Sequence, residues 1–295
     1  MTISEETMEM LRRSTTIAPG TMEAIPRATT ISEETMEMLR RSTTIAPETT
    51  AALRRLTADV QFPVLDESIR EAMREAFRRF HELWEHAMPS NWKGFEPHEV
   101  IATIERVRVA GFVLVWIPRA EIVRDVLAAD EGETAAVLLA RRDDVLDDAV
   151  ACLSEIEHPD LVLIRDGVEE AIRALRGGLP RAAQALASVA FTSEIHEFFE
   201  MGTKASRKRM IESDPEDAPL GQLRLRTIFV AGAKALDEFR PDRALPVRSD
   251  FNRHNSAHRL TREQWTEANA LSAIMLATAL LREMQYWYEL DDAKS

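Results

Sequence analysis

The stretch Leu271-Ser-Ala-Ile-Met-Leu-Ala-Thr-Ala-Leu-Leu281 is one of the two longest apolar candidates in the chain. A bilayer span takes about 18 to 20 residues, so this shorter run is expected to be the buried part of a helix. Upstream, Thr261-Arg-Glu-Gln264 has the pattern of a capping box, with Leu260 and Trp265 placed to form its hydrophobic staple. Together these features predict a last helix over residues 262 to about 290.

Further segments with helical spacing precede this helix and are separated by glycine and proline. Residues 203–219 are polar and are expected to form a loop. The carboxyl half is therefore predicted to be a helical bundle. Its other expected helices are Thr134 to Glu157, Gly167 to Leu175, Pro180 to Glu200, and Leu223 to Phe239, the last of which could contain a strand.

Residues 62–130 predict a smaller helical region. Apolar residues at steps of three and four predict a helix over 69–87, and a second is expected from Pro97 to Arg106. Gly111 to Ile117 fits either a short strand or a buried turn, and Pro118 is expected to open a helix through Ala129. The fold class is thus mainly α, with at most one or two short strands, and 131–295 as the helical bundle.

Residues 1–61 form a tandem repeat, because Thr2 to Pro19 recurs letter for letter as Thr30 to Pro47 and contains a finer period of 14 residues. Each unit is too short for a helix that is stable alone. The arm is either a flexible extension, dispensable for folding, or a multivalent ligand that docks on a partner protein. In the second case the partner-binding residues are Met8, Leu11, Ile25, Met36, Leu39 and Leu53.

The composition is that of an ordinary globular protein: of 295 residues, 45% are hydrophobic and 29% charged. The net charge of −13 argues against indiscriminate binding to nucleic acid. The single cysteine, Cys152, excludes an internal disulfide framework and fits a small core residue. We find no run long enough to span a membrane and no signal-peptide pattern at the N-terminus, so a cytoplasmic location is expected.

Motifs for common cofactors are missing from the sequence, which has no Gly-x-Gly-x-x-Gly and no Walker-type Gly-Lys-Ser/Thr. His81 and His86 are five residues apart and fall on different faces of a helix. His254 and His258 could share a face, but the glutamate of a zinc protease motif does not follow His254. Neither a metal nor a cofactor is expected.

The segment Phe251-Asn-Arg-His-Asn-Ser-Ala-His258 carries the residues best suited to chemistry. Metal-free cleavage of RNA needs a group that exchanges protons near neutral pH and a fixed cation for the charge on phosphorus. His258 can serve as the first and Arg253 as the second, because the planar guanidinium binds two phosphate oxygens at once. His254 or Asn255 could orient the phosphate.

This segment resembles the Arg-x4-6-His signature of the HEPN superfamily, and the resemblance extends over residues 134 to 292. It implies a helical bundle that acts as a homodimer, often as a metal-independent endoribonuclease in phage defence or toxin–antitoxin systems. Arg259 stands where related motifs often have Gly, and Glu194, Glu197 and Glu200 are candidates for the acidic residue that some members carry. The region from the stretch 114–123 onward also looks like uncharacterised actinobacterial proteins, a resemblance that implies no function.

Local charge supports an RNA substrate, because residues 240–262 contain six arginines against Asp242 and Asp250. Arg248 and Arg259 are therefore further candidates for substrate binding. In an alternative interpretation these arginines pair with acidic helices and His258 packs inside the bundle. The protein would then be a non-enzymatic adaptor whose repeats recruit a partner.

Overall fold

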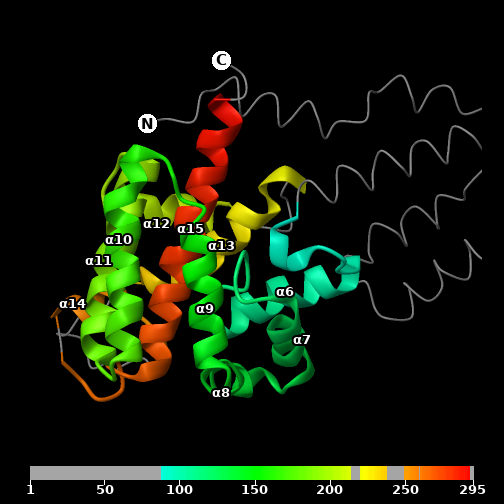
Figure 1. Ribbon diagram of the computed structural model, residues 1–295, viewed down its shortest axis with the longest axis horizontal. Helices are drawn as coiled ribbons and strands as arrows, with labels where there is room; N and C mark the ends of the chain where they lie inside the picture. Colours follow the sequence, from blue (N-terminus) through cyan, green and yellow to red (C-terminus); the bar gives the residue numbers. More distant parts are fainter. Residues whose placement is uncertain (1–87, 214–219, 238–248, 259, 293–295) are drawn as a thin grey trace, which may run out of the picture.

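The computed structural model describes residues 88–213, 220–237, 249–258 and 260–292, and the regular structure in these ranges is helical (Figure 1). The expected mainly α fold is confirmed. The repeat arm, its partner-binding candidates and the helix expected over 69–87 lie outside the described residues. Of the two expectations for Gly111 to Ile117 the buried turn is correct, since no strand forms there.

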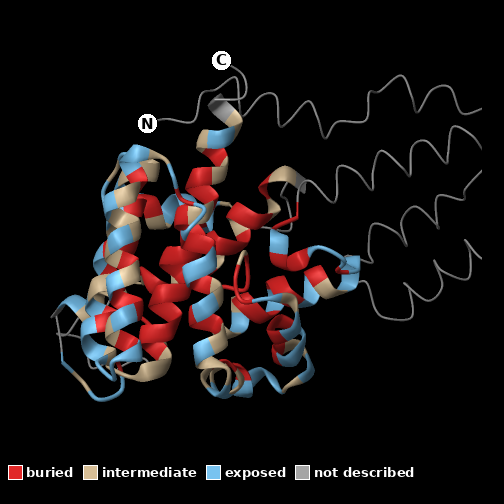
Figure 2. Cartoon of the chain, viewed as in Figure 1, coloured by how far each residue is buried: buried red, intermediate tan, exposed pale blue. Residues whose placement is uncertain are grey.

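The bundle is built around α15 (Glu267–Asp292). Every residue from 269 to 281 is buried, which Figure 2 shows as a continuous red segment. A helix that is apolar on all sides is expected at the centre of a bundle. Accordingly, α15 packs against α9 (Arg142–Leu153), α10 (Pro159–Arg176), α11 (Pro180–Phe199) and α13 (Leu223–Ala235). None of the helices in the described ranges has the length and apolar content that a membrane span requires.

The other side of the molecule consists of short helices around a buried loop. They are η1 (Ser90–Trp92), α6 (Pro97–Ala110), α7 (Ala120–Ala128) and η2 (Glu131–Glu133). Helix α6 ends at Gly111, whose φ of 76° lies in the left-handed region that glycine adopts at little cost. The following loop is held from inside, since Asn91 Nδ2 donates to the carbonyls of Leu114 and Pro118 at 3.1 and 2.8 Å. One hydrophobic core runs through this region and the bundle, across the predicted boundary at residue 130.

The start of α15 differs from the prediction. The helix begins at Glu267, and its cap is Thr266, whose Oγ1 accepts a hydrogen bond from the Asn269 N–H at 3.1 Å. The predicted staple does not form, because Leu260 is 80% exposed. The Oγ1 of Thr261 is buried without a hydrogen-bond partner. The capping-box pattern therefore marked the correct region but a position five residues too early.

Other helix boundaries also differ from the prediction. The long helix expected from Thr134 to Glu157 is divided at Arg141 into α8 (Thr134–Ala140) and α9. Arg141 leaves helical geometry and forms ion pairs with Asp125 and Asp144, at 2.9 and 2.8 Å. Helix α10 starts at Pro159, earlier than expected, because proline is well suited to the first helical position.

The region expected to be a loop at 203–219 contains α12 (Thr203–Ile211), followed by η4 (Leu220–Gln222). Helix α12 buries only Ser206 and Met210, so its sequence has almost no apolar periodicity to detect. Within the described residues 223–237 no strand forms, since Leu223–Ala235 is α13, and residues 238 and 239 lie outside the described part of the chain.

Candidate functional site

The Arg-x4-His segment forms a separate short helix, α14 (Arg253–His258), which packs against α11. Asn252 caps it: its Oδ1 accepts a hydrogen bond from the Asn255 N–H at 2.9 Å. The Asn252 side chain also donates to the carbonyl of Asp237 at 3.0 Å. The buried Asn252 therefore fixes both the start of α14 and its position on the bundle.

Arg253 faces α11 and lines a cleft of about 270 Å³. Its Nε donates to Thr192 Oγ1 at 3.1 Å. The other polar side chains lining the cleft are hydroxyls and one imidazole, belonging to Ser188, Ser193, His196 and Ser256. In the described part of the chain the half-buried guanidinium thus meets hydroxyl groups, which leaves most of its N–H donors available to an anion.

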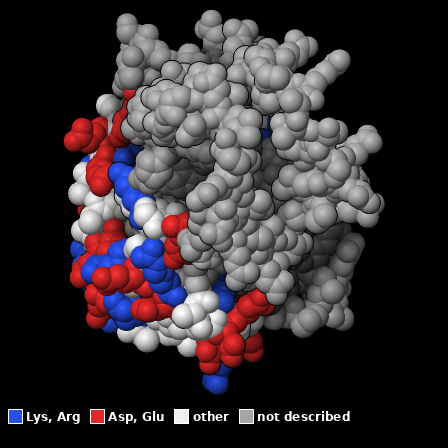
Figure 3. Space-filling model, turned by 90° about the vertical axis from the view of Figure 1, so that its right-hand side faces the viewer, with Lys and Arg blue, Asp and Glu red and all other residues white. Residues whose placement is uncertain are grey.

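This surrounding distinguishes Arg253 from many other arginines. On the face shown in Figure 3, the described acidic and basic side chains are intermixed. Arg119 pairs with Asp148 at 2.7 Å, and Arg124 with Glu99 at 2.9 Å. The latter contact lowers the pKa of Glu99, chiefly through the hydrogen bond from Arg124. Pairing with carboxylates accounts for these arginines, but within the described residues it does not account for Arg253.

The neighbouring residue His254 faces a different space. It borders a wider groove of about 1280 Å³ together with Thr203, Lys204, Arg207 and Lys208. The two spaces meet at α11 and α12, where His196 Nε2 lies 3.5 Å from Thr203 Oγ1. Arg253 thus lines a compact cleft, and His254 lines a broader groove that also contains Glu212 and apolar residues.

The remaining motif residues are not gathered at the Arg253 cleft. Asn255 is 1% exposed, and both its side-chain oxygen and nitrogen lack partners, so the structure does not present it to a substrate in the cleft. His258 ends α14, at a position about 140° around the helix from Arg253. The side chain of His258 lies outside the described residues, as do Arg248 and Arg259.

None of the three acidic candidates at positions 194, 197 and 200 is among the residues that line this cleft. Glu194 is completely buried and its carboxylate oxygens have no hydrogen-bond partner, and this burial raises the pKa of the carboxyl well above its ordinary value. Glu197 is half-buried. Glu200 is exposed and ends the helix in the left-handed region, at φ 52°.

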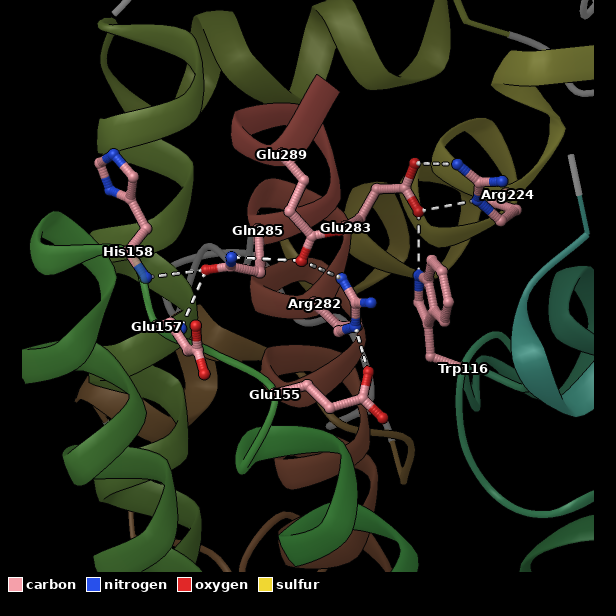
Figure 4. Close-up of polar contacts among 9 residues, drawn as sticks. All are labelled: Trp116, Glu155, Glu157, His158, Arg224, Arg282, Glu283, Gln285 and Glu289. Carbon is pink, nitrogen blue, oxygen red and sulfur yellow. Dashed lines mark hydrogen bonds and ion pairs between the residues drawn. The ribbon is translucent and has the colours of Figure 1, made fainter. Parts of the chain in front are cut away.

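A second polar cluster, which the sequence analysis missed, lies in the bundle core (Figure 4). Arg224 and Glu283 form an ion pair at 3.1 Å, with side chains 1% and 0% exposed. Trp116 Nε1 donates to Glu283 Oε2 at 2.9 Å, and Arg224 lies 4.1 Å from the ring centroid of Tyr286. Trp116 has a φ of 68°, a conformation that a large side chain rarely adopts. The cluster joins α13, α15 and the buried loop.

Figure 4 also shows how α15 is linked to the turn before α10. Gln285 Oε1 accepts hydrogen bonds from the backbone N–H groups of Glu157 and His158, at 3.1 and 2.9 Å. Arg282 Nε donates to Glu155 at 2.9 Å. These contacts satisfy polar groups at element ends, so a structural role explains them. For the cluster of Arg224 and Glu283, the signal in the sequence was the charged Glu283 within the mostly apolar helix α15.

The described residues contain no group of three or more His, Cys, Asp or Glu side chains arranged to hold a metal ion. Cys152 is buried, and desolvation raises the pKa of its thiol to about 12, so the thiolate is disfavoured at neutral pH. Comparisons with protein-family models, with curated proteins and with solved structures find no significant match.

Proposed function

We propose that the protein is a HEPN-like, metal-independent endoribonuclease that acts as a homodimer, with Arg253 as the residue that holds the scissile phosphate. One observation supports this most directly. A half-buried guanidinium lines a cleft of hydroxyl groups and, in the described part of the chain, has no carboxylate partner. Such a cleft suits a phosphate group, since an unpaired guanidinium and several hydroxyls all donate hydrogen bonds.

The chemistry fits the residue types. When the ribose 2′-hydroxyl attacks phosphorus, negative charge grows on the phosphate oxygens, and a preorganised cation stabilises it. Arg253 supplies this cation in the proposal, and His258 moves a proton. Arg253 and His258 stand at the two ends of the short helix α14. In the homodimer that the resemblance implies, Arg253 of one protomer would meet His258 of the other.

The test is cleavage of RNA by the full-length protein in EDTA. We expect cleavage by the wild type and a loss of about 10²-fold or more in Arg253→Ala, the scale for removing one preorganised donor. Arg253→Lys should recover only part of the rate, because an ammonium lacks the planar fork. Arg181→Ala, an exposed arginine on α11, is the matched control and should cleave normally. Intact RNA with the wild type, or cleavage that requires a divalent metal, would overturn the proposal.

The repeats within residues 1–61 favour a second candidate, a non-enzymatic adaptor whose arm docks on a partner protein. Tethered repeats bind through effective concentration, so their anchors should act together. Changing Leu11 and Leu39 to Ser in one chain should weaken capture of a partner far more than either change alone. Equal and negligible effects of all three variants would leave the arm as an extension without a docking role.

A further inference from the structure

Cleavage of RNA by its own 2′-hydroxyl requires two proton transfers. One proton leaves the 2′-oxygen as it attacks phosphorus, and one reaches the 5′-oxygen as it departs. The Arg-x4-His segment offers Arg253, which remains charged, and one proton-transfer group, His258. The other imidazole of the segment, His254, borders the wider groove, so a second group that exchanges protons near neutral pH has to come from another element.

A second imidazole, that of His196, lines the same cleft as Arg253. It lies on α11 one turn after Thr192, the residue that Arg253 contacts at 3.1 Å, and His196 and Arg253 line the same cleft. Of the described side chains around this cleft it is the only imidazole, and the others are hydroxyls, alkyl groups and the guanidinium. Serine and threonine hydroxyls do not give up protons near neutral pH, whereas imidazole does.

The surroundings of His196 also leave its imidazole ring accessible for proton transfer. The side chain is exposed, and its Nε2 lies 3.5 Å from Thr203 Oγ1, at the first residue of α12. When Nε2 donates to this hydroxyl, Nδ1 carries the lone pair that can accept a proton. In that tautomer the contact with Thr203 orients the ring between two helices and leaves the Nδ1 lone pair without a partner among the described residues.

We propose that His196 is the general base of the Arg253 cleft, an inference that rests on the proposed ribonuclease function. Its imidazole accepts the proton of the 2′-hydroxyl while the bond from O2′ to phosphorus forms. The bond from phosphorus to O5′ then breaks, and O5′ takes a proton from His258. The products are a 2′,3′-cyclic phosphate and a free 5′-hydroxyl, and neither a metal nor a redox partner takes part.

Two substrates separate a general base from a general acid. RNA has a poor leaving group that must be protonated, whereas uridine 3′-(4-nitrophenyl phosphate) has a leaving group that departs without a proton. His196→Ala should lose about 10² to 10⁴-fold on both substrates, since both need the 2′-oxygen deprotonated. His258→Ala should lose activity on RNA but keep its activity on the nitrophenyl ester. His98→Ala, an exposed histidine on α6, is the control.

A second measurement does not depend on cleavage. The ring-proton NMR signals of His196 should shift when inorganic phosphate is added to the wild type, and should not shift in Arg253→Ala. RNA left intact by the wild type would overturn the ribonuclease function itself. Full activity of His196→Ala, alongside an inactive Arg253→Ala, would overturn the role of His196 alone. A loss in His196→Ala that is confined to RNA would also overturn it, because that pattern identifies an acid.

Discussion

Glu194 brings a carboxyl group into the bundle with no hydrogen-bond partner among the described residues, and this makes its effect on stability depend on pH. Burial raises the pKa of Glu194 above its ordinary value of 4.5, so the folded protein binds this proton more tightly than the unfolded chain. The contribution of this bound proton to folding stability is fully present below pH 4.5 and is lost as the pH rises through the folded pKa of Glu194. At pH 7 the carboxyl group therefore opposes folding.

Glu194→Gln removes this dependence, since the amide is neutral at every pH. We expect the variant to be more stable than the wild type at pH 7 and to differ little at pH 4, as measured by urea unfolding at both values. Glu197→Gln, at the half-buried neighbour, provides the comparison. A variant that is equally or less stable than the wild type at pH 7 would show that the buried carboxyl has a partner in solution.

Arg224 and Glu283 lead to a prediction of the opposite sign, because each is the partner of the other. Arg224→Met leaves a buried, uncompensated carboxylate and should cost about 3 to 5 kcal/mol of unfolding free energy. Adding Glu283→Gln should restore much of the loss, because the amide keeps an acceptor for Trp116 but carries no charge. Tryptophan fluorescence in urea reports both variants. A double variant no more stable than Arg224→Met would contradict this explanation.

The residue types of the candidate site were visible in the sequence, but their directions were not. Neighbouring positions on a helix point about 100° apart, so Arg253, His254 and Asn255 face a cleft, a groove and the interior. Predicting this requires knowing that Asn252 caps a helix that starts at 253. His196 was not identified because only the packing of α14 on α11 brings it to the same cleft as Arg253.

At the scale of the elements, the cap of α15 can be tested by two threonines. Thr266→Ala removes the side-chain oxygen that accepts the hydrogen bond of the Asn269 N–H and should cost about 1 kcal/mol. Thr261→Val replaces a buried hydroxyl without a partner by a methyl group and should be neutral or slightly stabilising. Chemical denaturation measures both. If Thr261→Val were destabilising and Thr266→Ala neutral, Thr261 would be the cap of α15.

Elements were predictable where burial left a periodic pattern in the sequence. Helix α11 was predicted to within one residue at each end, because Pro180 opens it and the chain leaves helical geometry at Glu200. Helix α12 was missed because it buries only Ser206 and Met210. The division at Arg141 coincides with an ion pair to Asp125 on α7, which propensity along one helix cannot reveal.

At the scale of the whole molecule, a net charge of −13 has to be compatible with binding an anion. The two are compatible because the charge around Arg253 differs from that of the chain as a whole. Several arginines are paired with carboxylates, whereas Arg253 lines its cleft beside hydroxyls. A strongly acidic chain repels nucleic acid in general, so binding through one such cleft would be selective and sensitive to salt.

The proposed dimer makes a prediction that only the assembly can fulfil. If each active site combines Arg253 of one protomer with His258 of the other, Arg253→Ala and His258→Ala are each inactive alone. Mixed after dissociation and reassociation, they form heterodimers in which one of the two sites is intact. Random pairing makes half of the dimers mixed, so about a quarter of the wild-type cleavage rate should return. Mixing wild type with the double variant Arg253→Ala/His258→Ala controls for exchange between dimers. Two inactive variants that stay inactive after verified exchange would place both residues of one site within one protomer and overturn the shared site.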